Sequence, residues 1–369
     1  MSTGVYNEVH ACTFLFLMAE TLLMFDIECD VLEGLEMYAL DEIRERFGRL
    51  CSSITLHPGK VRMQYGGDLR SLLRLRSVLA AYLVVTYDVP RPRALLGHQH
   101  FTRLIRTLEM VRSLSRPERY HTLRLSAAGE DSSVLTRLKE TLARHTGLTV
   151  TPDDGDLLIR LRRTALNDGW EALVRLSPRP LATREWRVCN WPGSLNATLA
   201  SVMMRLTRPS ASDRILNLAC GSGTLLIERL FLAPARVAIG CDVDLAALQC
   251  AQRNLEAAGF AKVVRLEQWD ATLLPLETGS VDVVCADLPF GQLIGSHLGN
   301  EALYPRLIAE ASRVAAPGAR MCLLTHEVRL IERVFEQYAG VWTLTNVVRV
   351  RTGGMTPRVY LAQRATAPA

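Results

Sequence analysis

Four short apolar segments in the second half of the chain each lead to a glycine or an acidic residue, and this pattern constrains the fold most. They are 214–218, which runs into the turn 219–223, then 237–240 before Cys241-Asp242, 263–266 before Trp269-Asp270-Ala271, and 281–286 before Asp287. Helical patterns separate the first from the second and the second from the third. Strands that alternate with helices form a doubly wound α/β sheet, whose site lies at the carboxyl ends of the strands.

The residues at these strand ends have definite chemical uses. Gly221 and Gly223 allow a tight turn and a close approach to a ligand. The helix predicted over 224–232 presents free N–H groups to an anionic group. Asp242 can accept two hydrogen bonds from a ribose diol, and Asp270 can accept one from an adenine amino group. The glycine turn alone is weak support, but these features in this order together indicate a nucleoside-containing ligand.

Two longer motifs carry a resemblance to a known family. Asn217-Leu-Ala-Cys-Gly-Ser-Gly223 resembles the first motif of Rossmann-type S-adenosylmethionine-dependent methyltransferases, and Asp287-Leu288-Pro289-Phe290 resembles their Asp/Asn-Pro-Pro-Tyr/Phe motif for exocyclic amino groups. From about Arg179 to Arg364 the order of further motifs is similar to that of the THUMP-domain tRNA guanine-N2 methyltransferases. These motifs are Gly295-Ser296-His297, Asn300, Leu303-Tyr304-Pro305, Ser312-Arg313-Val314, Leu323-Leu324-Thr325, Gly353-Gly354 and Val359-Tyr360-Leu361.

The resemblance implies a catalytic role for residues 287–290. The lone pair of an aromatic amino group is delocalised, and two acceptors that hold its N–H groups can localise that pair. The Asp287 carboxylate and the Leu288 carbonyl are the expected acceptors, Pro289 fixes the backbone between them, and Phe290 stacks on the target base. Neither a metal nor a covalent nucleophile is required, so no metal site is expected.

The resemblance also implies a cofactor, S-adenosylmethionine, and the residues that bind it. These are Asn217, Ala219, Cys220, Gly221, Gly223, Thr224, Asp242, Val243, Asp270 and Ala271. Two roles stay open for Ser194 and Asn196: a contact with the methionine end of the cofactor, or capping of a helix. We expect structural or surface roles for His297 and His326. Relatives carry a basic pair after the motif glycine, where this chain has Gln292-Leu293.

The resemblance implies the fold class α/β and a division into domains. A Rossmann-like class I methyltransferase domain with a seven-stranded sheet is expected over 179–369, preceded by an α+β part with a ferredoxin-like region at 24–118 and a THUMP-like RNA-binding region at 119–178. A generic α+β domain is the alternative for that last region. Residues 1–23 are expected to be an extension. The apolar segment 11–25 contains Glu20, lacks a basic flank and is shorter than the ~20 residues of a membrane span.

Periodicity and turn residues predict the elements of the first half. They are a helix at 32–47 ending at Gly48, strands at 53–56, 61–65 and 77–87, a helix at 98–114, a strand at 120–125, a helix at 132–145 ending at Gly147, and a hairpin of 157–162 with 170–176.

Net charge and cysteine content limit which partners and which cellular compartment suit the chain. The net charge is +5, and residues 60–119 hold twelve basic side chains against four acidic ones. Such a bias suits RNA phosphates, and a plain solvated surface is the alternative. Of the 43 basic residues all but Lys60, Lys139 and Lys262 are arginine, which suits phosphate contacts or reflects genome composition. The nine cysteines form no CxxC pair, which predicts reduced thiols in the cytoplasm.

The function expected from these features is methyl transfer from S-adenosylmethionine to guanine N2 in tRNA, in the acceptor stem. Two alternatives stay open: a guanine-N2 methyltransferase of ribosomal RNA, and a non-catalytic RNA-binding protein that keeps the fold. A DNA substrate is disfavoured because a THUMP-like region would have no use there. No membrane partner is expected. A small activating subunit exists in eukaryotic relatives, but no residue here indicates one.

Overall fold

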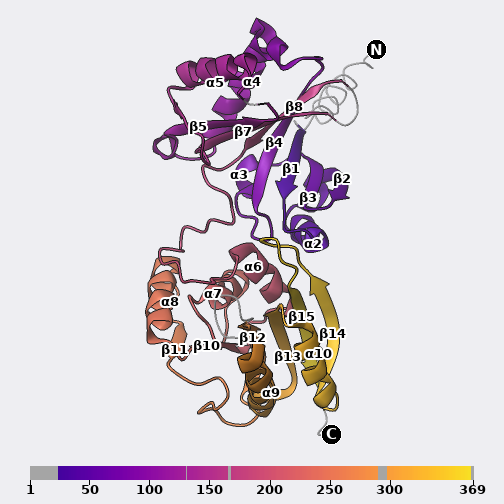
Figure 1. Ribbon diagram of the computed structural model, residues 1–369, viewed down its shortest axis with the longest axis vertical. Helices are drawn as coiled ribbons and strands as arrows, with labels where there is room; N and C mark the ends of the chain where they lie inside the picture. The colour runs from indigo at the N-terminus through magenta and orange to yellow at the C-terminus, as the bar shows by residue number, and fades with distance from the viewer. Residues whose placement is uncertain (1–23, 130, 165–167, 290–296, 367–369) are drawn as a thin grey trace, which may run out of the picture.

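The computed structural model describes residues 24–129, 131–164, 168–289 and 297–366. The chain forms two α/β units that lie end to end (Figure 1). In the first unit, the strands are β1 (Phe25–Asp30), β2 (Cys51–His57), β3 (Lys60–Tyr65), β4 (Ala80–Tyr87), β5 (Thr122–Ala127), β6 (Thr149–Val150), β7 (Leu157–Arg163) and β8 (Trp170–Arg175). Its helices are α2 (Glu36–Phe47), α3 (Leu69–Leu72), α4 (His98–Arg112) and α5 (Ser133–Thr146).

One eight-stranded sheet runs through the whole first unit, in the order β2-β3-β1-β4-β8-β7-β5-β6. β4 and β8 pair antiparallel from Tyr82 opposite Arg175 to Tyr87 opposite Trp170, so the segments before and after residue 118 share a sheet. Helices α4 and α5 cover it with apolar side chains at helical spacing. The buried positions are Leu104, Leu108 and Val111 in α4, and Leu135, Leu138 and Leu142 in α5.

Most elements of this unit follow the sequence pattern, but the strand expected at 77–87 begins at Ala80, and α3 and β6 were not expected. The helix predicted from residue 32 begins only at Glu36. Gly34 has a φ of 97° and lies so close to the backbone of Arg349 that a Cβ at this position would be 2.1 Å from the Arg349 carbonyl oxygen. Residues before Glu36 therefore form a contact with the end of the chain, including a bridge between Glu33 and Arg351, instead of a first helical turn.

The second unit is a seven-stranded sheet, as the sequence predicts. Its strands are β9 (Arg214–Leu218), β10 (Val237–Cys241), β11 (Val264–Glu267), β12 (Val281–Asp287), β13 (Ala315–Thr325), β14 (Trp342–Arg349) and β15 (Arg358–Arg364). The helices are α6 (Ala197–Leu206), α7 (Thr224–Leu232), α8 (Leu245–Ala258), α9 (His297–Val314) and α10 (Val328–Gln337).

The strand order β11-β10-β9-β12-β13-β15-β14 places β9 and β12 side by side at the centre. The chain winds outward from β9 in one direction and from β12 in the other, and β15 alone runs antiparallel to its two neighbours. Ligands of such sheets bind where the direction of winding changes. The carboxyl ends of β9 and β12 are therefore where a site is expected. Among the helices in the described ranges, none is both long and apolar enough to cross a membrane.

A buried carboxylate joins the two units. Glu228 of α7 is fully buried and accepts two hydrogen bonds from Arg76 of the first unit, each of 2.8 Å, and one of 2.9 Å from Arg184 of the connecting segment. The Arg76 guanidinium also lies 3.9 Å from the centroid of the Phe231 ring. Because α7 begins at the glycine turn, this contact fixes the first unit relative to the strand ends of the second.

Replacing Arg76 by alanine is expected to lower the free energy of unfolding by about 3 kcal/mol, because a buried carboxylate then loses one of its two cationic partners. Chemical denaturation measures this, with Arg74→Ala as the matched control, since Arg74 is an exposed arginine two residues away. Arg76→Lys should recover only part of the loss because lysine cannot form the bidentate contact. Equal stability of Arg76→Ala and Arg74→Ala would show that the contact does not hold the units together.

Candidate active site

A cavity of about 650 Å³ lies at the carboxyl ends of the central strands. Nine of the ten predicted cofactor residues line it: Asn217, Ala219, Cys220, Gly221, Thr224, Asp242, Val243, Asp270 and Ala271. Asp287, Leu288 and Pro289 line it as well, whereas Phe290 lies outside the described residues. The chain segments that the sequence predicts to act together are thus brought to one cavity. No group of three or more His, Cys, Asp or Glu side chains in the described residues is placed to hold a metal.

The turn between β9 and α7 has an unusual backbone. Ala219, Gly221 and Gly223 all have positive φ, of 45°, 51° and 78°. An alanine in this conformation is strained, and such strain is typical of ligand-binding turns. Gly223 does not line the cavity: it caps α7, and a Cβ there would lie 3.3 Å from the Ala251 Cβ. Gly223 therefore shapes the turn, and Gly221 borders the cavity.

The two acidic residues of the neighbouring strands are held by backbone N–H groups. Asp242 accepts 2.9 Å and 3.0 Å hydrogen bonds from the N–H groups of Gly221 and Asp244, one at each carboxylate oxygen. Asp270 Oδ1 accepts from the N–H and the hydroxyl of Thr272, both at 2.8 Å. The bond from the Thr272 N–H lowers the pKa of Asp270. Both carboxylates keep further lone pairs for a ligand, and Asp242 also links the glycine turn to β10.

Two buried oxygen atoms at the cavity have no hydrogen-bond partner among the described residues. They are Oδ1 of Asp287 and Oδ1 of Asn217. Asn217 Nδ2 donates to the Leu218 and Cys285 carbonyls, each at 3.1 Å, so its amide is oriented. Burial raises the pKa of Asp287 to about 7. Buried acceptors without donors are rare in folded proteins, so these two oxygens fit a ligand that supplies N–H or cationic groups.

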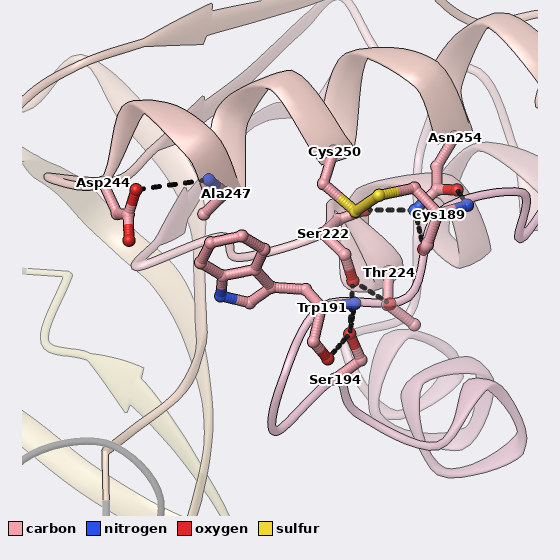
Figure 2. Close-up of a disulfide and its surroundings, with 9 residues drawn as sticks. All are labelled: Cys189, Trp191, Ser194, Ser222, Thr224, Asp244, Ala247, Cys250 and Asn254. Carbon is pink, nitrogen blue, oxygen red and sulfur yellow. Dashed lines mark hydrogen bonds between the residues drawn. A yellow bond between two sulfur atoms is a disulfide. The ribbon is translucent and has the colours of Figure 1, made fainter.

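One wall of the cavity is a segment whose role the sequence left open. Trp191, Gly193 and Ser194 line the cavity, and Ser194 Oγ lies 3.0 Å from Ser222 Oγ (Figure 2). Asn196 caps α6 by accepting from the Thr198 and Leu199 N–H groups. The two residues therefore differ: Ser194 borders the ligand space, and Asn196 caps the helix. Trp269, Asn300 and Leu303 also line the cavity, and residue pattern alone did not identify Trp269.

The expectation of reduced thiols is wrong for two cysteines. Cys189 and Cys250 form a disulfide that ties the segment before Trp191 to α8 (Figure 2). Asn254 of α8 strengthens the tie, because it accepts from the Cys189 N–H at 2.9 Å and donates to the Cys189 carbonyl at 3.0 Å. The two cysteines are 61 positions apart in the sequence, so spacing arguments could not indicate the pairing. The other cysteines in the described ranges, Cys29, Cys51, Cys220, Cys241, Cys285 and Cys322, are free.

The two histidines take peripheral places. His297 is 62% exposed and its Nδ1 lies 2.9 Å from Glu327 Oε2. Burial lowers the pKa of His326. Neither lines the cavity, in keeping with the surface or structural roles expected for them.

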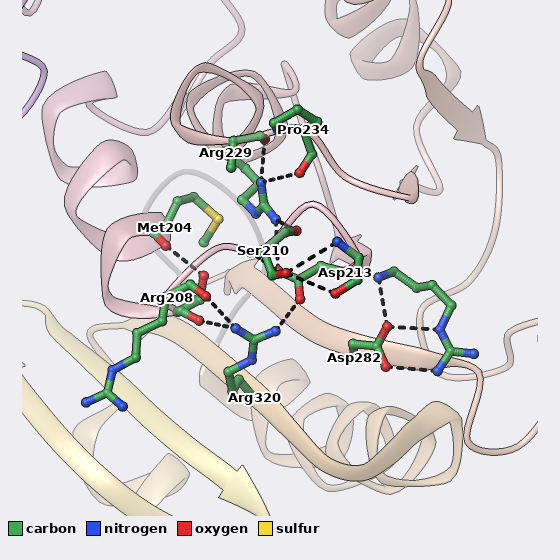
Figure 3. Close-up of polar contacts among 12 residues, drawn as sticks. Met204, Arg208, Ser210, Asp213, Arg229, Pro234, Asp282 and Arg320 are labelled. Carbon is green, nitrogen blue, oxygen red and sulfur yellow. Dashed lines mark hydrogen bonds and ion pairs between the residues drawn. The ribbon is translucent and has the colours of Figure 1, made fainter.

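A polar network lies at the amino ends of the central strands, opposite the cavity (Figure 3). Asp213 accepts 2.8 Å bonds from Arg229 and from the Ser210 N–H, and it pairs with Arg320. Asp282, at the start of β12, forms a two-bond contact with Arg214. These contacts join the starts of β9 and β12 to the ends of α6 and α7, so the cavity end of β12 is built on a fixed base.

The residues that line the cavity lie within a region that is similar to known proteins. Residues 184–358 match the family described as RMKL-like, methyltransferase domain. A mouse protein, tRNA (guanine(6)-N(2))-methyltransferase THUMP3, is 34% identical over 185 residues, which are 47% of this chain and 37% of that protein. The chain therefore spans only about a third of the length of the first curated relatives that it matches. The tRNA (guanine(6)-N2)-methyltransferase of Thermus thermophilus is 27% identical over 345 residues, covering 92% of this chain and 99% of that one.

Solved structures share the fold along nearly the whole chain. TrmN from Thermus thermophilus superimposes with a TM-score of 0.72 at 24% identity, over 92% of this chain and 99% of that one. The protein SMU.472 complexed with SAH gives a TM-score of 0.65 at 14% identity, over 92% of this chain and 97% of that one. At these identities the likeness concerns the arrangement of both units and not their chemistry.

Proposed function

We propose that the chain methylates guanine N2 in tRNA, because residues 184–358 match the methyltransferase domain described as RMKL-like and the chain is similar to tRNA guanine-N2 methyltransferases. The observation that supports this most is the buried, unpartnered Oδ1 of Asp287 at the end of β12, inside a cavity whose other residues suit a nucleoside. The acceptor stem is the proposed position.

S-adenosylmethionine is the proposed methyl donor, and it would supply an electrophilic methyl group. Asp242 would bind its ribose diol and Asp270 its adenine amino group. Asn217 Oδ1 and the turn at Gly221 would face its methionine end, next to Ser194. The remaining predicted lining residues, Ala219, Cys220, Thr224, Val243 and Ala271, would enclose the cofactor, with Gly223 supporting the turn.

The chain's own part in the reaction is to orient the amino nitrogen. One N–H group of guanine N2 would donate to Asp287 Oδ1 and the other to the Leu288 carbonyl, which localises the nitrogen lone pair. Phe290 would stack on the base, as the resemblance implies. Accepting the methyl group, with the electrons of its former bond left on the donor, would give the nitrogen a positive charge, and Asp287 Oδ1 could take one of its protons because the pKa of this carboxyl is about 7. Rate then comes from positioning and from electrostatics.

The first unit is the proposed RNA-docking part, with a ferredoxin-like region at 24–118 and a THUMP-like region at 119–178. Eight arginines between residues 60 and 119 are exposed: Arg70, Arg74, Arg91, Arg93, Arg103, Arg106, Arg116 and Arg119. Their charge favours a phosphate backbone and makes binding depend on salt. Recognition would be mainly of shape and backbone, as is usual for double-stranded RNA.

A second RNA substrate is favoured by similar proteins of cattle and mouse. The bovine U6 snRNA (guanine-N(2))-methyltransferase THUMPD2 is 35% identical over 133 residues, 36% of this chain and 26% of that protein. A small nuclear RNA or another structured RNA is thus the second candidate, with the same chemistry at Asp287. We place the protein in the cytoplasm on the ground of a tRNA substrate alone, since the disulfide removes the support from cysteines.

Methylation of tRNA with trimmed 3′ ends tests the docking part of the proposal. The first unit is expected to hold the 3′ end, so removing the terminal nucleotides should lower methylation although they lie away from the target base. Intact tRNA and U6 snRNA transcripts serve as parallel substrates. Equal methylation of trimmed and intact tRNA would contradict the docking role, and faster methylation of the snRNA would favour the second candidate.

A further inference from the structure

The hydroxyl of Tyr304 lies directly behind the catalytic motif. Tyr304 of α9 is fully buried, and its hydroxyl oxygen is 2.7 Å from the Pro289 carbonyl oxygen and 2.8 Å from Thr325 Oγ1. Thr325, at the end of β13, is also fully buried, and its Oγ1 is 2.9 Å from the Glu327 backbone nitrogen. Three hydrogen bonds thus connect Glu327 to Pro289 through two side-chain hydroxyls.

The two ends of this chain of hydrogen bonds fix the direction of every proton in it. The Pro289 carbonyl can only accept, so Tyr304 donates to it. The Glu327 N–H can only donate, so Thr325 Oγ1 accepts from it, and the Thr325 hydroxyl donates a hydrogen bond to the Tyr304 oxygen. Burial raises the pKa of Tyr304, so the hydroxyl keeps its proton. Bonds aligned in one direction polarise and strengthen one another.

These bonds hold the two peptide groups that flank the Leu288–Pro289 peptide, and the bond from Tyr304 acts on the later one. The ring of Pro289 fixes its φ, and the bond from Tyr304 fixes the direction of its carbonyl. On the other side, the Leu288 N–H donates to the Leu324 carbonyl at 2.9 Å. Given the proposed function, on which this step rests, the Leu288 carbonyl between these two restraints is one of the two acceptors for the amino group.

We propose that Tyr304 and Thr325 are positioning residues for methyl transfer. They hold the Leu288 carbonyl, and with it the start of the loop that follows Asp287, in the direction that the target amino group requires. Neither touches the substrate. Their effect should therefore fall on turnover and not on cofactor affinity.

Tyr304→Phe removes only the hydroxyl. We expect kcat to fall about 10- to 100-fold, because a displacement of about 1 Å in a reacting group has effects of this size. KM for tRNA and the dissociation constant of S-adenosylmethionine should stay within about twofold of the wild type. Tyr360→Phe is the matched control: Tyr360 is fully buried in β15, the neighbour of β13, and donates one 3.1 Å bond to Glu332, away from the cavity. It should keep wild-type kcat.

Variants at Thr325 separate positioning from a general structural role. Thr325→Ser keeps the hydroxyl and should keep kcat near the wild-type value, whereas Thr325→Val keeps the shape and should lower kcat as Tyr304→Phe does. The double variant Tyr304→Phe/Thr325→Val should be no slower than either single variant, because both break the same chain of bonds.

Wild-type activity is measured first. A wild type that methylates no RNA overturns the proposed function, and this inference with it. An active wild type whose Tyr304→Phe variant keeps kcat within twofold overturns the inference alone. The same holds if Tyr304→Phe and Tyr360→Phe lower kcat equally, or if Thr325→Ser is as slow as Thr325→Val.

Discussion

Asp287→Ala should lower kcat for methyl transfer by ~10²–10³ while the dissociation constant of S-adenosylmethionine stays within about threefold. The variant removes the buried Oδ1 that has no partner among the described residues, and we propose that this atom holds the amino group mainly in the transition state. Single-turnover assays and calorimetry give the two quantities. Asp282→Ala is the matched control, since Asp282 begins the same strand and contacts Arg214 at its far end.

The raised pKa of Asp287 gives this prediction a pH dependence. The free protein holds the carboxyl proton up to pH about 7, whereas an unperturbed Asp side chain loses it near 3.8. Only the ionised form accepts freely, so kcat/KM should rise with pH through about 7, and a bound sulfonium cation should shift the kcat profile to lower pH.

The same pKa predicts an effect on stability. Because the folded-state pKa is raised, stability from the neutral carboxyl is fully present below about pH 4 and is lost as pH rises towards 7. Asp287→Asn should therefore raise the melting temperature at pH 8 and have little effect at pH 4. A variant that is inactive and also less stable at pH 8 would contradict the assignment of a buried acceptor.

Asp242→Ala should weaken binding of S-adenosylmethionine by ~10- to 100-fold, which corresponds to roughly 1.5–3 kcal/mol for a charged acceptor. The loss has two sources: the proposed bonds to the ribose diol, and the 2.9 Å bond that links Asp242 to the glycine turn through the Gly221 N–H. Asp242→Asn keeps one acceptor oxygen and should give an intermediate affinity.

Affinity for tRNA is the internal control for Asp242. It should be unchanged, because the eight exposed arginines that we propose for RNA contact lie in the first unit. Calorimetry with the cofactor and filter binding with tRNA decide the matter. Unchanged cofactor affinity in Asp242→Ala, or an equal loss for both ligands, would contradict its place in the cofactor site.

Much of the fold could be predicted from the sequence because local pattern and tertiary environment agree there. The helix at 224–232 and the strand ends before Asp242 and Asp287 lie where alternation of apolar segments and glycine placed them. The pattern could not show that β4 and β8 pair, since the two strands are far apart in sequence and both read as buried strands. The late start of α2 at Glu36 was equally hidden, because it depends on a contact between Gly34 and Arg349.

In the candidate site, too, local motifs could be predicted and contacts between distant segments could not. Most of the motif residues could be predicted to lie together, because each motif carries its own backbone or charge requirement. Residues that reach the site from other elements could not: the disulfide of Cys189 with Cys250 and the hydroxyl chain through Tyr304 depend on packing between distant segments. Tyr304 stood within a recognised motif, yet its partner Pro289 is fifteen residues away, and nothing in the spacing indicates a contact.

The most direct test of the central claim is nucleoside mass spectrometry of tRNA incubated with the full chain and S-adenosylmethionine that carries an isotopic label in its methyl group. The label should appear in N2-methylguanosine, with Asp287→Ala giving at least a hundredfold less. Label in methylated adenosine or cytidine, or equal N2-methylguanosine from wild type and Asp287→Ala, would contradict the account.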